Sequence, residues 1–144
     1  MKKTYIILTL FLTALFVTSC ETYDDFEADR PTVAGFTLGT TLQLPVSANN
    51  PTITFNVPFY VSTASDADRT LNVVVLADQT TLTPASYSYE SSVVLPAGER
   101  SGTMEFIAMN VGLTNEYQPV TFAFETVAGI VSGPTADIEL RTTD

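Results

Sequence analysis

The side chains that carry most enzyme chemistry are scarce in this sequence. Its 144 residues include no histidine and one cysteine, Cys20. A Ser-His or Cys-His pair therefore cannot form, and a metal hydrolase would lack its commonest nitrogen ligand. Two carboxylates could still hydrolyse a glycoside, because only their separation in space matters. A chain of this size with short predicted loops leaves little room for a cleft, so we predict that the protein is not an enzyme and needs no cofactor.

Cys20 follows a segment with the composition of an export signal. Two lysines precede an apolar stretch, residues 5–17, which is shorter than the roughly 20 residues needed to cross a bilayer as a helix. Small residues then lead directly into the cysteine. The sequence Val17-Thr18-Ser19-Cys20 resembles a bacterial lipobox, which implies cleavage before Cys20 and a diacylglyceryl thioether on its sulfur.

The alternative is an ordinary secretory signal with an incidental cysteine. The position of Cys20 favours lipidation, because the only thiol lies where lipid transfer needs one. A single cysteine also cannot form an intramolecular disulfide. Because acyl chains contribute roughly 0.8 kcal/mol per buried methylene, several chains anchor a protein durably. We therefore predict a lipoprotein signal peptide over residues 1–19 and a membrane anchor at Cys20.

Residues 20–31 are predicted to form an acidic tether between the lipidated cysteine and the rest of the chain. The segment 21–29 is rich in Asp and Glu, and a solvated, self-repelling linker explains this composition. Acidic residues shortly after a lipidated cysteine also resemble the surface-export signal of lipoproteins in the Bacteroidota. That resemblance implies an outer-membrane lipoprotein of the cell envelope that is exposed at the cell surface.

The charge of the chain argues against a nucleic-acid partner. Of the six basic residues, Lys2 and Lys3 lie in the predicted signal peptide, which leaves 6 − 2 = 4 arginines against 16 acidic residues. The difference, 4 − 16 = −12, describes a surface that repels phosphate backbones. We therefore expect no binding to nucleic acid.

Alternation of apolar and polar residues predicts one all-β domain over residues 32–144. The clearest run is 53–62, although Pro58 within it predicts an edge strand or a bulge. The run 71–77, nearly continuous in Val and Leu, predicts a strand covered on both faces. Further strands are predicted at 93–95, 103–109, 117–126 and 136–141, with a weaker one within 33–46.

About six to eight short strands without helical crossovers predict two packed antiparallel sheets, as in an immunoglobulin-like sandwich. Their apolar faces should meet between the sheets. The predicted core residues are Ile53, Phe55, Val57, Phe59, Val73, Val75, Phe106, Phe122, Phe124 and Ile138.

Three tyrosines are candidate ligand-binding residues. Sugar rings stack on exposed aromatic faces, and Tyr87 and Tyr89, two residues apart, would project on the same side of an extended strand. Tyr60 lies opposite the apolar stripe of its strand and is therefore expected to be exposed. The alternative is that these tyrosines cover the sheet and form hydrogen bonds through their hydroxyls.

The segment Tyr87 to Asn110, "YSYESSVVLPAGERSGTMEFIAMN", followed by "NEYQPVTFAFE", resembles Calx-beta domains. It is also similar to sandwich domains of unknown function on Bacteroidota lipoproteins, of the kind found beside Sus-type glycan-uptake systems. The resemblance covers about residues 53–140, and its best element is a strand, a Pro-Ala-Gly-Glu turn and a second strand. It implies a Calx-beta-like sandwich and a link to glycan utilisation.

The same resemblance raises the question of calcium, which Calx-beta domains bind through clustered Asp and Glu. Calcium needs six to eight oxygen ligands, several of them carboxylates. Asp66 and Asp68 could also bind an ion, although a solvated loop explains them. We predict no metal site, with a calcium-binding domain as the less favoured reading. The positions where the family pattern has acids hold Ser86, Asn110, Gly112 and Leu113, and only Glu116 is retained.

These observations together predict a non-catalytic, lipid-anchored binding or scaffold module of the cell envelope. Its partners would be the membrane, through the lipid, and polysaccharide or other envelope proteins. The alternative is a structural or adhesive subunit of the outer surface that acts through protein contacts.

Overall fold

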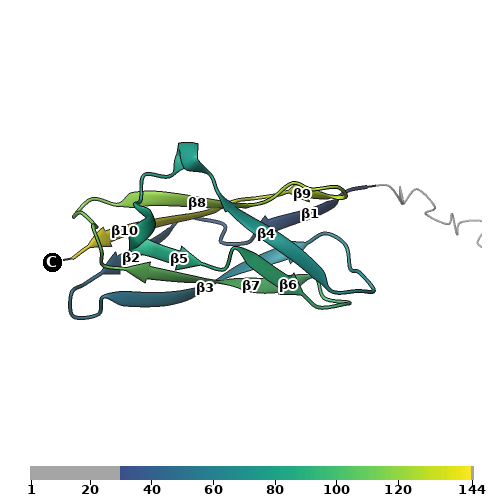
Figure 1. The fold of residues 1–144 in the computed structure, drawn as a ribbon, viewed down its shortest axis with the longest axis horizontal. Helices are drawn as coiled ribbons and strands as arrows, with labels where there is room; N and C mark the ends of the chain where they lie inside the picture. Colours follow the sequence, from purple (N-terminus) through teal and green to yellow (C-terminus); the bar gives the residue numbers. More distant parts are fainter. Residues whose placement is uncertain (1–29, 144) are drawn as a thin grey trace, which may run out of the picture. The chain divides into compact units, whose positions relative to one another are not determined.

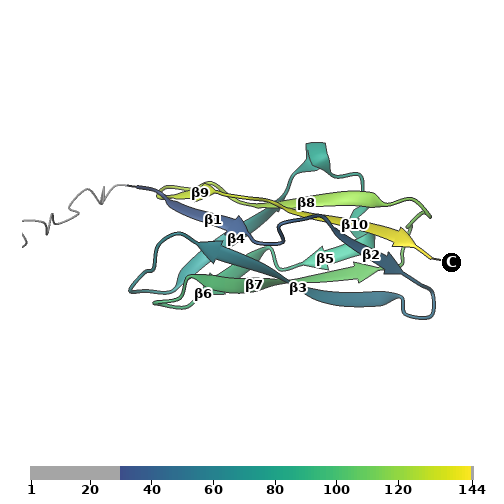
Figure 2. The same ribbon diagram turned by 180° about the vertical axis from the view of Figure 1, so that it is seen from behind.

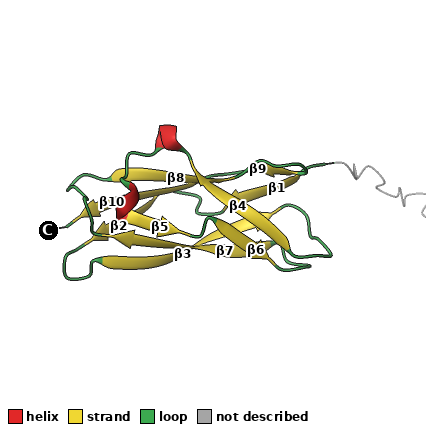
Figure 3. Ribbon diagram, viewed as in Figure 1, coloured by secondary structure: helices red, strands yellow, loops and turns green. Residues whose placement is uncertain are grey.

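The computed structural model describes residues 30–143, so the predicted signal peptide, Cys20 and most of the acidic tether lie outside the described residues. Within 30–143 the chain forms ten strands in two five-stranded sheets (Figure 1). Figure 3 shows that helix is confined to two single 3-10 turns, Ala77–Gln79 and Pro84–Ser86. None of the helices in this part of the chain could span a membrane. The predicted all-β, two-sheet architecture is confirmed.

The first sheet, sheet A, has the strand order β5-β7-β3-β1-β9. Its centre is the long antiparallel pair of β3 and β7, in register from Thr52 opposite Met109 to Tyr60 opposite Ser101. The strands of sheet A are β1 (Thr32–Phe36), β3 (Thr52–Val61), β5 (Tyr87–Tyr89), β7 (Ser101–Met109) and β9 (Ile130–Ser132).

The second sheet, sheet B, has the order β2-β10-β8-β4-β6. Most of the other strands that were predicted from alternating apolar and polar residues lie in this sheet. β8 is at its centre, between β10 and β4. The strands of sheet B are β2 (Leu42–Val46), β4 (Arg69–Val75), β6 (Ser92–Leu95), β8 (Gln118–Phe124) and β10 (Ala136–Thr142).

The first and last parts of the described chain run parallel to each other and change sheets together. β1 pairs in parallel with β9 in sheet A, and β2 pairs in parallel with β10 in sheet B. Figure 2 shows β1 continuing into β2 alongside β9 and β10. The prediction of wholly antiparallel sheets is therefore wrong at these two pairs. Alternation shows which face of a strand is apolar but carries no information on the direction of its partner.

The prediction of six to eight strands is also wrong, because the described residues form ten. The single strand predicted within 33–46 is two strands, since the chain leaves sheet A after Phe36 and enters sheet B at Leu42. The other two additions, β5 and β9, have three residues each. A run of three residues is too short to show a period.

The core lies between the sheets and contains seven of the ten predicted core residues. Ile53, Phe55 and Val75 are half-buried and pack against it. Phe36 stacks on Phe124 with ring centroids 4.6 Å apart, and this stacked pair joins sheet A to sheet B. The predicted residues that are fully buried are Val57, Phe59, Val73, Phe106, Phe122, Phe124 and Ile138.

Pro58 lies in a central strand without a bulge, so the prediction of an edge strand or bulge is wrong. The pairing of β3 with β7 continues one to one through Pro58 and Thr103. On the other side of β3, the last paired residue of β1 is Phe36, opposite Phe59. The Pro58 carbonyl accepts a hydrogen bond from the Thr37 N–H at 3.0 Å. Pro58 has no N–H to donate to β1, but β1 is already leaving the sheet at this point. The proline therefore costs the pairing of β1 with β3 few hydrogen bonds.

β4 was predicted to be covered on both faces, and this is wrong too. Leu71 and Val73 are buried, but Asn72 is exposed and Val74 is 36% exposed. One face of β4 packs on the core and the other faces solvent. The run of Val and Leu residues hid this alternation, because both faces carry apolar side chains.

Candidate functional site

The two segments that change sheets differ in length by two residues. Ala34 is paired with Ser132 in sheet A, and Leu42 is paired with Ile138 in sheet B. The first segment therefore advances 42 − 34 = 8 residues while the second advances 138 − 132 = 6. Both segments connect the same two sheets. The two extra residues of the 34–42 segment must therefore loop away from the 132–138 segment. Gly39 in this loop has a φ of +71°, which glycine adopts without steric cost.

A groove of about 610 Å³ lies where the longer segment separates from the shorter one. A hydrogen bond from the Phe36 N–H to the Pro134 carbonyl, 2.9 Å long, joins the two segments just before they separate. We call this hollow the switch groove. It is lined by Phe36 at the end of β1, by residues 37–41 of the β1–β2 connection, by Pro134 and Thr135 of the β9–β10 connection, by Asp137 of β10, and by Tyr60 of β3.

Tyr60 and Pro134 form an apolar patch in the switch groove, and Gly35 explains how they come together. Gly35 is the partner of Tyr60 across β1 and β3. A Cβ at Gly35 would lie 2.5 Å from Pro134 Cδ and 3.2 Å from Tyr60 Cε1. The absence of a side chain at Gly35 therefore allows both rings to lie against the backbone of β1.

Asp137 carries the only formal charge among the residues that line the groove. It lies on β10 opposite Thr121 of β8, and the Thr121 hydroxyl donates a hydrogen bond to Asp137 Oδ1 at 2.9 Å. The other oxygen, Oδ2, is not among the buried side-chain atoms that lack a partner in the described part of the chain. It also has no donor within residues 30–143. Oδ2 is therefore open to solvent and free to accept a hydrogen bond from a ligand.

The switch groove combines an aromatic face, several threonine hydroxyls and one carboxylate. Four threonines line it, at positions 37, 40, 41 and 135. Ligand sites of this kind combine an apolar surface with a few polar groups that fix orientation. Tyr60, one of the three predicted ligand-binding residues, is the one that the structure places here.

Tyr87 and Tyr89 lie elsewhere, on the edge strand β5, with their rings directed into the sandwich. The Tyr89 ring centroid is 4.8 Å from that of Phe122. Tyr87 stacks on Phe106 at 6.2 Å and meets Phe122 edge-on at 6.0 Å. Burial, and to a lesser degree the neighbouring Tyr89, raises the pKa of Tyr87 above its ordinary value. Both rings are half-buried, and a ligand-binding role for them stays a prediction.

The positions compared with calcium ligands have structural contacts. Ser86 is completely buried, and its hydroxyl donates to the Val111 carbonyl at 2.7 Å. The Thr83 hydroxyl lies 2.7 Å from the Ser86 Oγ. Asp68 accepts a hydrogen bond from the Ala97 N–H at 2.9 Å, which ties two loops together. Residues 30–143 contain no group of three or more His, Cys, Asp or Glu side chains placed to hold a metal ion.

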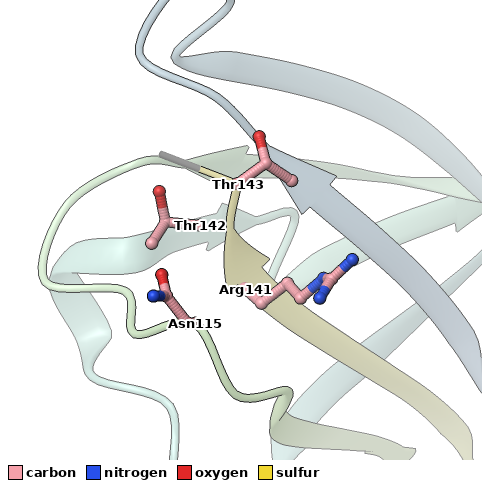
Figure 4. Close-up of a pocket in the computed structure, with 4 residues that line it drawn as sticks. All are labelled: Asn115, Arg141, Thr142 and Thr143. Carbon is pink, nitrogen blue, oxygen red and sulfur yellow. The ribbon is translucent and has the colours of Figure 1, made fainter.

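A second hollow, of about 310 Å³, lies at the end of the sandwich where β10 finishes. It is lined by Asn115, Arg141, Thr142 and Thr143. Figure 4 shows the Arg141 guanidinium pointing away from the other three side chains. The guanidinium carbon lies 4.8 Å from the centre of the Tyr117 ring, and the Arg141 Nε is buried without a hydrogen-bond partner. The Arg141 guanidinium therefore does not share this hollow with the polar groups of Asn115, Thr142 and Thr143. For this reason the hollow is a weaker candidate ligand site than the switch groove.

Sequence reasoning found Tyr60 but missed the rest of the switch groove. The missed residues come from two connections that are about 100 residues apart in the chain, and only the parallel pairing of β1 with β9 brings them together. The available signals were the turn-forming residues Gly39 and Gly133-Pro134, which interrupt apolar runs. They mark a break in a strand but do not show that the two breaks are adjacent.

No protein-family model matches the chain, and no curated protein matches it. Several solved structures are similar in fold. One is a protein of unknown function from Bacteroides ovatus, 15% identical with a TM-score of 0.61, covering 76% of this chain and 44% of that one. Another, from the same organism, is named as a candidate carbohydrate-binding protein. It is 10% identical with a TM-score of 0.57, covering 74% of this chain and 36% of that one.

A third similar structure is the apo form of the Calx CBD1 domain, 11% identical with a TM-score of 0.56. It is matched over 79% of this chain and 99% of its own length. The fold is that of a Calx-beta-like sandwich. The Calx-beta-like sandwich seen here spans less than half of the two Bacteroides proteins it matches. Because the sequence identities are low, these similarities concern the fold.

Proposed function

We propose that this protein is a lipid-anchored, non-catalytic glycan-binding module of the bacterial cell envelope. Its ligand site is the switch groove, and the ring of Tyr60 is the surface on which a sugar stacks. The anchoring part of the proposal rests on the sequence around Cys20, and the location at the outer surface rests on the acidic segment that follows it.

The single observation that carries the proposal is the combination of side chains in the switch groove. One face of a pyranose ring is rich in C–H groups and packs well on an aromatic ring. The hydroxyls at the ring edge can donate to Asp137 and exchange hydrogen bonds with the surrounding threonines. The similarity to a Bacteroides ovatus protein named as a candidate carbohydrate binder supports the same ligand class.

The non-catalytic part of the proposal is supported by the number of carboxylates. Glycosidases commonly place two carboxyl groups roughly 5 to 10 Å apart on either side of the scissile bond. Among residues 30–143, Asp137 is the only carboxylate that lines the switch groove. A sugar in this groove would therefore be held without the second group that the usual hydrolysis needs.

Affinity gel electrophoresis of the full-length protein in mild detergent, across a panel of soluble polysaccharides, tests the proposal. At least one glycan should retard the wild-type protein. Tyr60→Ala should weaken that retardation about tenfold, because it removes the stacking surface, whereas Tyr60→Phe should retain most of it. Tyr117→Ala, which removes a ring that does not line the groove, is the control.

Thermal unfolding of each variant shows that the mutations act on binding rather than on folding. No retardation by any glycan would contradict the proposal. It would favour the alternative predicted from the sequence, a subunit that acts through protein contacts.

A further inference from the structure

The residues that line the switch groove carry negative charge and no positive charge. Of the residues that the structure describes, Asp137 is the only charged one in its lining, and none of the four arginines lines it. The arginine on the same strand, Arg141, is held over the Tyr117 ring at the end of β10. The whole chain has a formal net charge of −10, so the surroundings add to the negative potential of the groove rather than offset it.

We propose that the switch groove selects uncharged glycans and rejects acidic ones, such as uronic acids and sulfated sugars, with Asp137 as the residue that makes this distinction. The inference rests on the proposed glycan function and names the ligand class. Asp137 Oδ2 accepts a hydrogen bond from a sugar hydroxyl, and a bond to a charged acceptor of this kind is stronger than one between neutral groups. A carboxylate or sulfate at the same place would meet a like charge and find no cation.

Thr121 is a positioning residue in this proposal. Its side chain is 3% exposed, and its backbone N–H is held by the Thr80 hydroxyl at 3.2 Å. The Thr121 hydroxyl donates to Asp137 Oδ1 and so restricts the orientation of the carboxylate, whose Oδ2 has no donor within residues 30–143. A ligand hydroxyl then meets an acceptor that is already oriented, which lowers the entropy cost of binding.

The experiment compares two oligosaccharides of equal length, one neutral and one in which the sugars are the corresponding uronic acids. Affinities for the full-length protein are measured by isothermal titration calorimetry. The neutral ligand should bind at least about tenfold more tightly at low salt. The difference should shrink as ionic strength rises, because salt screens the repulsion between like charges.

Four variants locate the effect. Asp137→Asn should weaken neutral binding about tenfold and reduce the preference over the uronate to less than about threefold. Glu139→Gln is the matched control, because it makes the same change of charge two residues along β10 but does not line the groove. Thr121→Val should weaken neutral binding about threefold, and Thr121→Ser should restore it.

The outcomes separate this inference from the proposed function. If neither ligand type, nor any other glycan, binds the wild-type protein, the proposed function fails and the inference fails with it. If the uronate binds as tightly as the neutral ligand, or if Asp137→Asn leaves the preference unchanged, the inference fails while glycan binding stands. An equal effect of Glu139→Gln would also overturn it, because the preference would then come from net charge alone.

Discussion

Tyr60 and Tyr87 show how the fold assigns different roles to the same type of side chain. Tyr60 lies over a glycine on the outer surface of sheet A and lines the switch groove. Tyr87 is turned into the sandwich, where its ring contacts Phe106 and Phe122. The difference follows from position: Tyr60 alternates with the apolar residues of a long strand, while Tyr87 lies on a short edge strand that closes the core.

The raised pKa of Tyr87 predicts a loss of stability at alkaline pH. A tyrosine that resists ionisation in the folded state stabilises the fold fully below the unfolded-state pKa of about 10. That contribution is lost as pH rises from about 10 through the higher folded-state pKa. Tyr87→Phe cannot ionise, so its free energy of unfolding should decline less than that of the wild type above pH 10.

Urea unfolding at a series of pH values between neutrality and strong alkali measures this difference. Tyr117→Phe is a suitable control, because the Tyr117 ring packs against the Arg141 guanidinium and not against the aromatic core. If the free energy of unfolding of Tyr87→Phe fell with pH as steeply as that of the wild type, the pKa of Tyr87 would not be the cause of the alkaline loss of stability.

At the scale of elements, residue alternation predicted the long strands, because one face of each is buried. The run 53–62 became β3 (Thr52–Val61), and the run 136–141 became β10 (Ala136–Thr142). The same signal could not show which strands pair in parallel, because face and direction are independent. Nor could it show that Pro58 lies beside the point where β1 leaves the sheet.

The candidate site was harder to predict than the fold for a related reason. Tyr60 could be named from its place on a strand, because alternation gives the face of a residue. Asp137 also alternates with core residues, but its neighbours in space, Thr121 and the loop around Gly39, depend on the pairing of distant segments. A groove produced by unequal connection lengths exists only in the folded structure.

Deleting Gly39 and Thr40 should close the switch groove without unfolding the protein. Both residues are exposed, and a Cβ at Gly39 would meet nothing within 4 Å. The deletion gives the two sheet-changing segments equal lengths, so the β1–β2 connection can follow the β9–β10 connection closely. We expect a thermal midpoint close to that of the wild type and loss of retardation by the glycan that binds the wild type.

Thr40→Ser is the matched control, because it keeps both the hydroxyl and the length of the loop. It should retain most of the binding. A deletion variant that folds and still binds the glycan would show that the ligand lies outside the groove.

At the scale of the whole molecule, the described chain enters at one end of the sandwich and finishes at the other (Figure 1). β1 begins at Thr32, twelve positions after Cys20 (32 − 20 = 12). At roughly 3.3 to 3.6 Å per residue, a fully extended segment of this length would reach about 40 Å.

Changing Cys20 to serine should release the protein from the membrane, because no lipid can be attached without the thiol. The wild-type protein should partition into the detergent phase and show the mass of an acylated amino terminus. Cys20→Ser should appear in the aqueous phase with an unacylated mass. A wild-type protein with an unmodified amino terminus would contradict lipid anchoring, although the glycan experiments above would still stand by themselves.

The position of the switch groove has a mechanical consequence. Its first wall begins at Phe36, only four residues after the start of β1 (36 − 32 = 4). Under the proposed lipid anchoring and glycan binding, pulling on a bound polymer would load β1, which precedes the groove in the chain. β1 is flanked by β3 and β9 along this stretch, so its ladder hydrogen bonds share the load. In that arrangement β4 and β6 would not lie between the anchor and the groove, so the pairing of β1 with its neighbours would be loaded before those strands.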